Sequence, residues 1–131
     1  MSDRVSVEVP GLEHMNPIPN ASRIGSFLAS GGIFGKDPKT GKVADGLEAQ
    51  LAQTFANVRT ILKAGGAKPE HVIKLNVWLK DIGDRPVLNK YWLEMFPDPH
   101  SRPARHTFPT PDLREPLLVE CEIIAVIPDA K

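Results

Sequence analysis

Two charged residues near the C-terminal end of the chain are the best candidates for chemistry. Arg105 lies in a short strand-like segment, 103–107, that follows a proline-rich loop, and Glu120 interrupts a stretch that is otherwise strongly apolar. A guanidinium can hold a carboxylate through two parallel hydrogen bonds, and a carboxylate can orient or deprotonate a water molecule. A structural interpretation is also open, in which Arg105 pairs with a neighbouring acid and Glu120 or Glu122 caps a sheet edge. Burying either charge without a partner would cost free energy, so we expect these residues to lie at the rim of the sheet or at an interface.

The motifs of other common sites are missing from the sequence. It contains no glycine-rich dinucleotide loop, no Walker loop, no C-x-x-C pair and no H-E-x-x-H zinc motif. None of the four histidines stands at a familiar ligand spacing from another, so no metal site is expected. The serines lack the context of a nucleophile, and no Ser/His/Asp triad can be identified. Cys121 alternates away from Glu120 onto an apolar face, which favours a buried small side chain over a nucleophile.

The composition is typical of one globular domain, predicted over 1–131. Hydrophobic residues make up 41% and charged residues 24% of the 131 positions, close to globular averages. Sixteen basic residues balance sixteen acidic ones, which gives no electrostatic case for binding nucleic acid or a membrane. The single cysteine allows no intrachain disulfide. The first apolar stretch is too brief for a signal peptide, and no run approaches a membrane span, so we predict a cytoplasmic protein.

Two amphipathic helices are predicted, over 46–64 and 85–96. In the first, apolar residues recur at spacings of three and four, and Gly65-Gly66 supplies a left-handed stop. In the second, Asp84 is the expected N-cap.

Period-two patterns predict strands over 71–80 and 117–127. In the first of them, Ile73, Leu75 and Val77 are expected to share one face with Leu79. Shorter strand candidates lie at 5–9, 26–31 and 104–109.

The order of these elements predicts an α+β fold, with two helices covering one face of a mixed sheet. The other face would then carry Trp78, Leu118, Ile124 and Val126. An exposed apolar patch of this kind usually marks an interface, so a homo-oligomer is expected.

At these residues the sequence resembles the reactive intermediate deaminase (Rid, or YjgF-like) family, from about residue 16 to residue 126. No single block of the resemblance is very specific, but all of them occur in order and at the right separations. The matching segments are 30–33 (Ser-Gly-x-Ile turn), 37–43 (acidic Pro-x-Thr-Gly hairpin), Gln50, Gln53 and Asn57-Val58 in the first helix, Asn89, Trp92 and Phe96 in the second, and 103–105 and 119–125 near the end.

The resemblance implies a chorismate-mutase-like homotrimer with cofactor-free active sites between subunits. It implies hydrolysis of enamine or imine intermediates of the 2-aminoacrylate type to 2-keto acids and ammonia. Carried over by position, Arg105 holds the carboxylate of a small-molecule substrate and Glu120 positions the attacking water. The backbone at Ser30 and Gly31 lines the pocket, with Thr107 beside it.

The sequence departs from the family pattern at the expected pocket mouth. Ile18 replaces the tyrosine whose ring closes the pocket, and Gly32 stands where glutamine is common. The pocket is therefore expected to be reshaped, to admit larger substrates past Ile18, and to include His14 or Asn16. Asn89, from one of the matching blocks, is expected to contact the substrate.

Two alternatives stay open. One is a pathway deaminase for a larger enamine acid, similar to the 2-aminomuconate deaminases. The other is a non-enzymatic small-molecule-binding or chaperone-like trimer, with a ribonuclease as a variant. The retained Arg105 argues against the non-enzymatic form, and zero net charge argues against the ribonuclease.

Overall fold

The computed structural model describes residues 3–129, which form a six-stranded sheet and two α-helices. The elements in chain order are β1 (Val5–Val7), β2 (Ala21–Ile24), β3 (Phe27–Ser30), α1 (Leu47–Ala64), β4 (Val72–Leu79), α2 (Arg85–Met95), β5 (Ala104–Pro109) and β6 (Val119–Val126). Short 3₁₀ turns, η1 (Pro69–His71) and η2 (Ile82–Asp84), precede β4 and α2.

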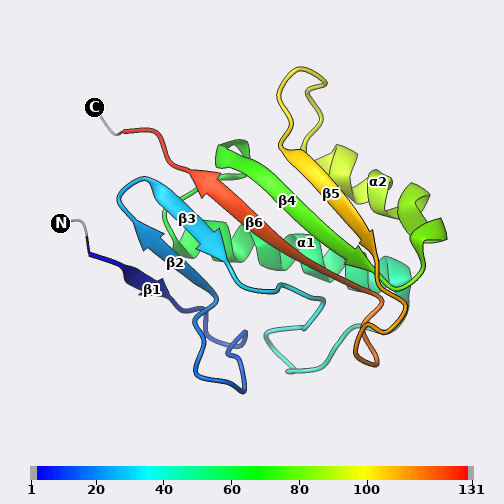
Figure 1. Ribbon diagram of the computed structural model, residues 1–131. Coiled ribbons are helices and arrows are strands. Elements are labelled where there is room, and N and C mark those ends of the chain that lie inside the picture. The colour runs from blue at the N-terminus through cyan, green and yellow to red at the C-terminus, as the bar shows by residue number, and fades with distance from the viewer. Residues whose placement is uncertain (1–2, 130–131) are drawn as a thin grey trace.

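The sheet is mixed, and both helices lie on one of its faces, as Figure 1 shows. The strand order is β1-β2-β3-β6-β4-β5, so β1 and β5 are the edges. Among the six described strands, only β4 and β5 run parallel to each other, because α2 carries the chain back along the sheet between them. The other neighbouring strands are antiparallel. The predicted α+β class and the placement of two helices on one face are confirmed.

The first helix forms where its apolar spacing predicts it. Leu51, Phe55, Val58 and Leu62 are at most 3% exposed and pack onto the sheet. Gly66, at φ +83°, adopts the left-handed conformation that ends the helix. Helix α2 also begins at the predicted residue, and Asp84 occupies the predicted N-cap position. The Asp84 side chain makes no capping hydrogen bond, because the chain already turns through η2 at that point.

The expected face of Ile73 is wrong. Ile73 is 54% exposed, whereas Val72 is 5% exposed and lies in the core with Leu75. The pairing of β4 with β6 shifts between Val72 and Lys74, where β4 carries an extra residue. Such a bulge reverses the alternation of the residues before it. The strand β2 was not predicted at all.

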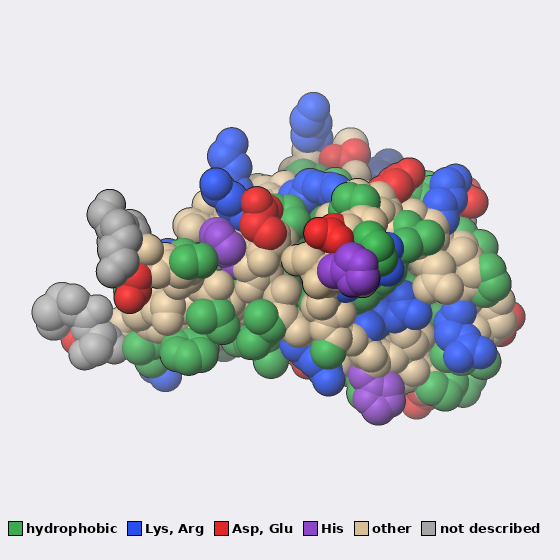
Figure 2. Space-filling view, turned by 90° about the horizontal axis from the view of Figure 1, so that it is seen from above, with side chains coloured by type: hydrophobic (Ala, Val, Ile, Leu, Met, Phe, Trp, Pro, Cys, Tyr) green, Lys and Arg blue, Asp and Glu red, His purple; other side chains and the backbone are tan. Residues whose placement is uncertain are grey.

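The face of the sheet opposite the helices is open and partly apolar. Ile124 is 39% exposed and Phe27 on the neighbouring strand is 63% exposed, and Trp78 stacks on Phe108 with ring centroids 5.4 Å apart. In Figure 1 the open face of the sheet is turned toward the viewer. Figure 2 looks at the molecule from above, so this face lies along its lower margin, where hydrophobic side chains are visible. The exposed apolar face expected from the sequence is therefore present.

Candidate active site

Arg105 lies on edge strand β5 and points toward helix α2. Its partner across the ladder is Leu75, a core residue, so the Arg105 side chain lies on the helix-covered side of the sheet. The Nη1 atom donates a hydrogen bond of 2.9 Å to Oδ1 of Asn89. The guanidinium carbon lies 4.9 Å from the centroid of the Trp92 ring. Asn89 and Trp92 thus fix the guanidinium from the adjacent helix, and a cation held over an indole ring is stabilised by it.

The Arg105 guanidinium has no acidic partner among residues 3–129. Its only side-chain hydrogen bond to a described residue is to the neutral amide of Asn89. Burial, followed by the charge of Arg85, lowers the pKa of the Arg105 guanidinium. The structural alternative, an ion pair with a neighbouring acid, is therefore not found. A half-buried cation in this position would be stabilised by an incoming anion.

Glu120 lies on the opposite face of the sheet. Its ladder partner is Trp78, which belongs to the open face. The Glu120 carboxylate occupies the space above Gly32, where a Cβ atom would lie 2.2 Å from Oε2. Any residue with a Cβ atom at position 32 would therefore force the Glu120 carboxylate to move.

Burial is the main cause that raises the pKa of the Glu120 carboxyl above its ordinary value. The positive charges of Arg114 and His14 act against this shift, and the negative charge of Glu122 adds to it. A carboxyl with a raised pKa is better suited to exchange protons near neutral pH than an ordinary surface glutamate.

Arg105 and Glu120 are not brought together within one subunit. They project from opposite faces of the sheet, from strands that flank β4. Thr107 shares the helix side with Arg105, because its ladder partner is the buried Val77. The two halves of the expected site therefore lie on separate surfaces of the chain.

Ser30 uses its side chain within the protein. Its hydroxyl accepts a hydrogen bond from the backbone N–H of Ile123 and donates one to the carbonyl of Gly31, at 2.9 and 2.8 Å. These bonds hold the end of β3 against β6 and orient the following Gly31 backbone. Ile18, the residue expected at the pocket mouth, is 49% exposed.

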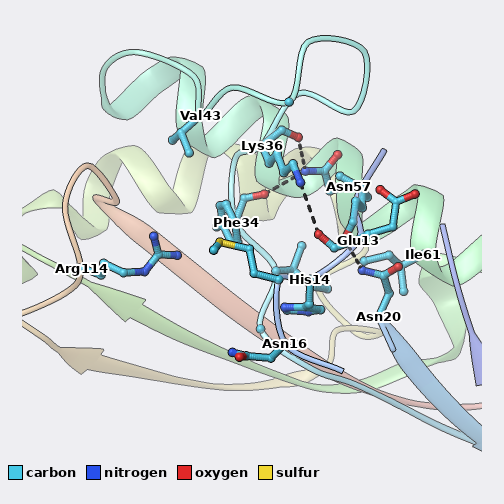
Figure 3. Close-up of a pocket in the computed structure, with 15 residues that line it drawn as sticks. Glu13, His14, Asn16, Asn20, Phe34, Lys36, Val43, Asn57, Ile61 and Arg114 are labelled. Atoms are coloured by element: carbon cyan, nitrogen blue, oxygen red, sulfur yellow. Dashed lines mark hydrogen bonds between the residues drawn. The ribbon is translucent and has the colours of Figure 1, made fainter. Parts of the chain in front are cut away.

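A pocket lies between the loop 12–16, the segment after β3, and α1 (Figure 3). Its volume is about 440 Å³. His14 and Asn16 line it, together with Gly32, Phe34 and Arg114. Arg105 and Ile18 do not line it. Phe34 and Arg114 were not singled out from the sequence.

Cys121 is 1% exposed, and burial raises the pKa of its thiol. It is a core residue, as predicted. Within residues 3–129, no three His, Cys, Asp or Glu side chains are grouped so that they could hold a metal ion. In the same part of the chain, neither helix combines the length and apolar character needed to cross a bilayer.

Comparison with known proteins agrees with this architecture. A model of the Endoribonuclease L-PSP family matches residues 12–127. A RutC family protein of Aquifex aeolicus is 35% identical over 112 residues, which are 86% of this chain and 90% of the relative. A 2-iminobutanoate/2-iminopropanoate deaminase of Salmonella typhimurium is 32% identical over 113 residues, covering 86% and 88%.

Similarity to a solved structure extends over nearly the whole chain. The crystal structure of RidA from the Antarctic bacterium Psychrobacter sp. PAMC 21119 has a TM-score of 0.87 to this structure at 29% sequence identity. It covers 94% of this chain and 99% of its own. With a family match over residues 12–127 and relatives above 30% identity, the protein belongs to the Rid family, whose model is described as Endoribonuclease L-PSP.

Proposed function

We propose that this protein hydrolyses enamine or imine intermediates of 2-amino acids to 2-keto acids and ammonia. The observation that carries the proposal is the Arg105 guanidinium, which is half-buried and held by Asn89 and Trp92 but has no acidic partner among the described residues. A planar carboxylate is the group that such a fork binds best. The naming of relatives as 2-iminobutanoate/2-iminopropanoate deaminases supports the same chemistry.

The proposed active site lies between subunits of a homotrimer. Arg105 and Thr107 would come from the edge strand of one subunit, and Glu120 with the Ser30–Gly31 backbone from its neighbour. The separation of Arg105 and Glu120 on opposite sheet faces supports this arrangement, as does the open apolar face.

The reaction requires a carboxylate anchor, a water molecule and a proton carrier. Arg105 holds the substrate carboxylate. Glu120 takes a proton from water as the oxygen–carbon bond forms at the imine carbon and passes it to the imine nitrogen, which gives a carbinolamine. Glu120 then takes the hydroxyl proton of the carbinolamine as the keto group forms and delivers it to nitrogen as the carbon–nitrogen bond breaks, so that ammonia leaves and the 2-keto acid remains. One water is consumed and no electrons are transferred, so we expect activity without a metal or organic cofactor.

An endoribonuclease activity is the less favoured candidate. The chain has zero formal net charge, and Figure 2 shows basic and acidic side chains interspersed over the visible face. Binding a polyanion requires a concentrated positive surface. The direct test of the deaminase is ammonia release from enamines generated in situ, with and without the Arg105 side chain.

The oligomeric state is a testable part of the proposal. Light scattering at micromolar concentration is expected to give about three times the chain mass of 14.4 kDa. Replacement of Ile124 by glutamate should weaken the trimer, because it places a charge on the open sheet face. The matched control is Leu93→Glu, since Leu93 is 49% exposed but lies on α2, away from that face. A stable wild-type monomer or dimer would contradict the site arrangement as well.

The position of the Glu120 carboxylate can be tested through Gly32. Gly32→Ala places a Cβ in the space that the carboxylate occupies, so the carboxylate must move, while the backbone at Gly32 does not need a left-handed conformation. We expect deaminase activity to fall by about tenfold or more, with a change in the free energy of unfolding of about 1 kcal/mol or less. Adding Gly32→Ala to Glu120→Gln should cause no further loss, because the two changes act on one group. Full activity in Gly32→Ala would show that this carboxylate position is not the working one.

A further inference from the structure

Arg114 is a cation held at the edge of the pocket with its charge unpaired. It lies in the loop before β6, and its guanidinium points toward the cavity in Figure 3. The guanidinium carbon is 5.7 Å from the centroid of the Phe34 ring. Within residues 3–129, no hydrogen bond or ion pair engages the Arg114 side chain. Stacking on an aromatic ring limits where an exposed arginine can point and leaves its fork of donors free for an anion.

Two other charged residues of this pocket, Lys36 and Glu13, make contacts within the chain. The Lys36 Nζ donates to the backbone carbonyl of Glu13 at 3.3 Å. The Glu13 carboxylate accepts a hydrogen bond from the backbone N–H of Gly11 at 3.0 Å, and backbone hydrogen bonds are the main cause that lowers the pKa of Glu13. His14 also lines the pocket. Arg114 is therefore the group best placed to meet a negative charge entering the cavity.

The pocket adjoins the proposed catalytic carboxylate. Gly32 lines the pocket, and the Glu120 carboxylate lies over Gly32. Arg114 and His14 are the two basic residues that act to lower the pKa of Glu120. A substrate that reacts beside Glu120 can therefore extend past Gly32 toward Phe34 and Arg114.

The size of the pocket exceeds what a three-carbon imino acid needs. Its volume of about 440 Å³ falls in the range of roughly 300–1,000 Å³ found for sites that enclose larger organic ligands. Phe34, which lines the pocket with Gly32, supplies an apolar face beside Arg114. The lining is thus suited to a chain with an apolar or unsaturated middle and an anionic far end.

We propose that Arg114 binds a second, distal acidic group, so that the preferred substrates are enamines or imines of 2-amino dicarboxylic acids. The inference rests on the proposed function for the reaction itself, and it adds the substrate class. The carboxylate next to the reacting carbon binds Arg105 of one subunit, and the distal carboxylate binds Arg114 of the neighbour that supplies Glu120. The imine carbon then lies between them, where one water replaces the nitrogen and ammonia leaves.

Substrate selectivity tests this role of Arg114. Imines of diacids with four to six carbons and of monoacids of equal length are generated in situ by amino-acid oxidases, and kcat/KM is compared. In the wild type the diacid is expected to be preferred, and Arg114→Ala should lower the diacid-to-monoacid ratio by about 10- to 100-fold. Any effect of Arg114 on Glu120 acts on both substrates and cancels in the ratio. Arg114→Lys should retain part of the preference.

The matched control is Arg59→Ala, which removes the same charge from the exposed surface of α1, outside the pocket. Its selectivity ratio should equal that of the wild type. A wild-type ratio near one, or a ratio unchanged by Arg114→Ala, would overturn the assignment even if imine hydrolysis is observed.

A binding measurement separates this inference from the deaminase proposal. Calorimetry with six-carbon 2-keto diacid and monoacid products needs no turnover. Tighter binding of the diacid that is lost in Arg114→Ala supports the distal anion site, even if no imine is hydrolysed and the proposed reaction fails. Equal binding of both keto acids, or diacid binding unaffected by Arg114→Ala, contradicts the site whatever the activity.

Discussion

Replacement of Arg105 by alanine is expected to lower kcat/KM for imine hydrolysis by about 30- to 1,000-fold, or about 2–4 kcal/mol in transition-state binding. The guanidinium is fixed by Asn89 and Trp92 on α2 and has no acidic partner among the described residues, so its donors are available to the substrate carboxylate. Ammonia release from enamines generated in situ measures the effect. Activity within twofold of the wild type would exclude Arg105 as the anchor.

Three variants separate anchoring from general effects of charge. Arg105→Lys should also be poor, because one ammonium cannot reproduce a planar pair of donors. Asn89→Ala should give a smaller loss, since the Asn89 amide orients the guanidinium without having to touch the substrate. Arg85→Ala is the matched control, because Arg85 is a nearby exposed arginine whose charge only disfavours the Arg105 cation. It should leave kcat/KM unchanged or slightly improved.

The helices and the open face could be predicted because each rests on a regular repeat. Spacings of three and four predicted that Leu51, Phe55 and Val58 lie in the core, where they are found. The period of two in β6 predicted that Glu120 and Cys121 lie on opposite faces of the sheet. The face of Ile73 could not be predicted in the same way, because one extra residue at the bulge reverses the alternation. The signal that could have revealed β2 is the two-residue Gly25-Ser26 turn joining it to β3.

The candidate site was only partly predictable because its contacts join distant parts of the chain. Arg105 and Glu120 could be found as charges within strands. The bond between Arg105 and Asn89 depends on the return of the chain through α2 to a parallel strand, and the stacking of Arg114 on Phe34 joins two loops. Neither contact leaves a spacing pattern in the sequence.

Replacement of Glu120 by glutamine is expected to lower deaminase activity by about 10²- to 10⁴-fold, the usual contribution of a general base. Glutamine keeps the shape of the side chain but cannot accept a proton from water. In the wild type, kcat/KM should rise with pH as the carboxyl loses its proton, and this limb should lie above the ordinary range for glutamate because burial raises the pKa of Glu120. The pH–rate profile of Glu120→Gln should lack that limb.

The same substitution should stabilise the fold at neutral pH. Because the pKa of Glu120 is raised in the folded state, the folded chain holds this proton in a pH window where the unfolded chain has released it. Stability is therefore lost as pH rises through that window, and above the window the wild type bears the whole cost of the buried charge. Thermal unfolding should show Glu120→Gln with the higher Tm at pH 7 and a smaller difference near pH 4. A variant that is more stable but less active is the result expected when the wild-type residue serves function and lowers the stability of the fold.

Mixed trimers of the two inactive variants test whether Arg105 and Glu120 act across a subunit boundary. The side chains project from opposite faces of the sheet, so each proposed site combines Arg105 from one subunit with Glu120 from the next. Subunits with Arg105→Ala and subunits with Glu120→Gln are co-expressed with different tags, and trimers carrying both tags are purified. In a closed three-fold ring, either mixed composition contains one interface in which both residues are intact, so about one-third of wild-type activity should return. If the two residues act within one subunit, every site in the mixed trimer lacks one of them. Activity at the background of the single variants would then refute the intersubunit site.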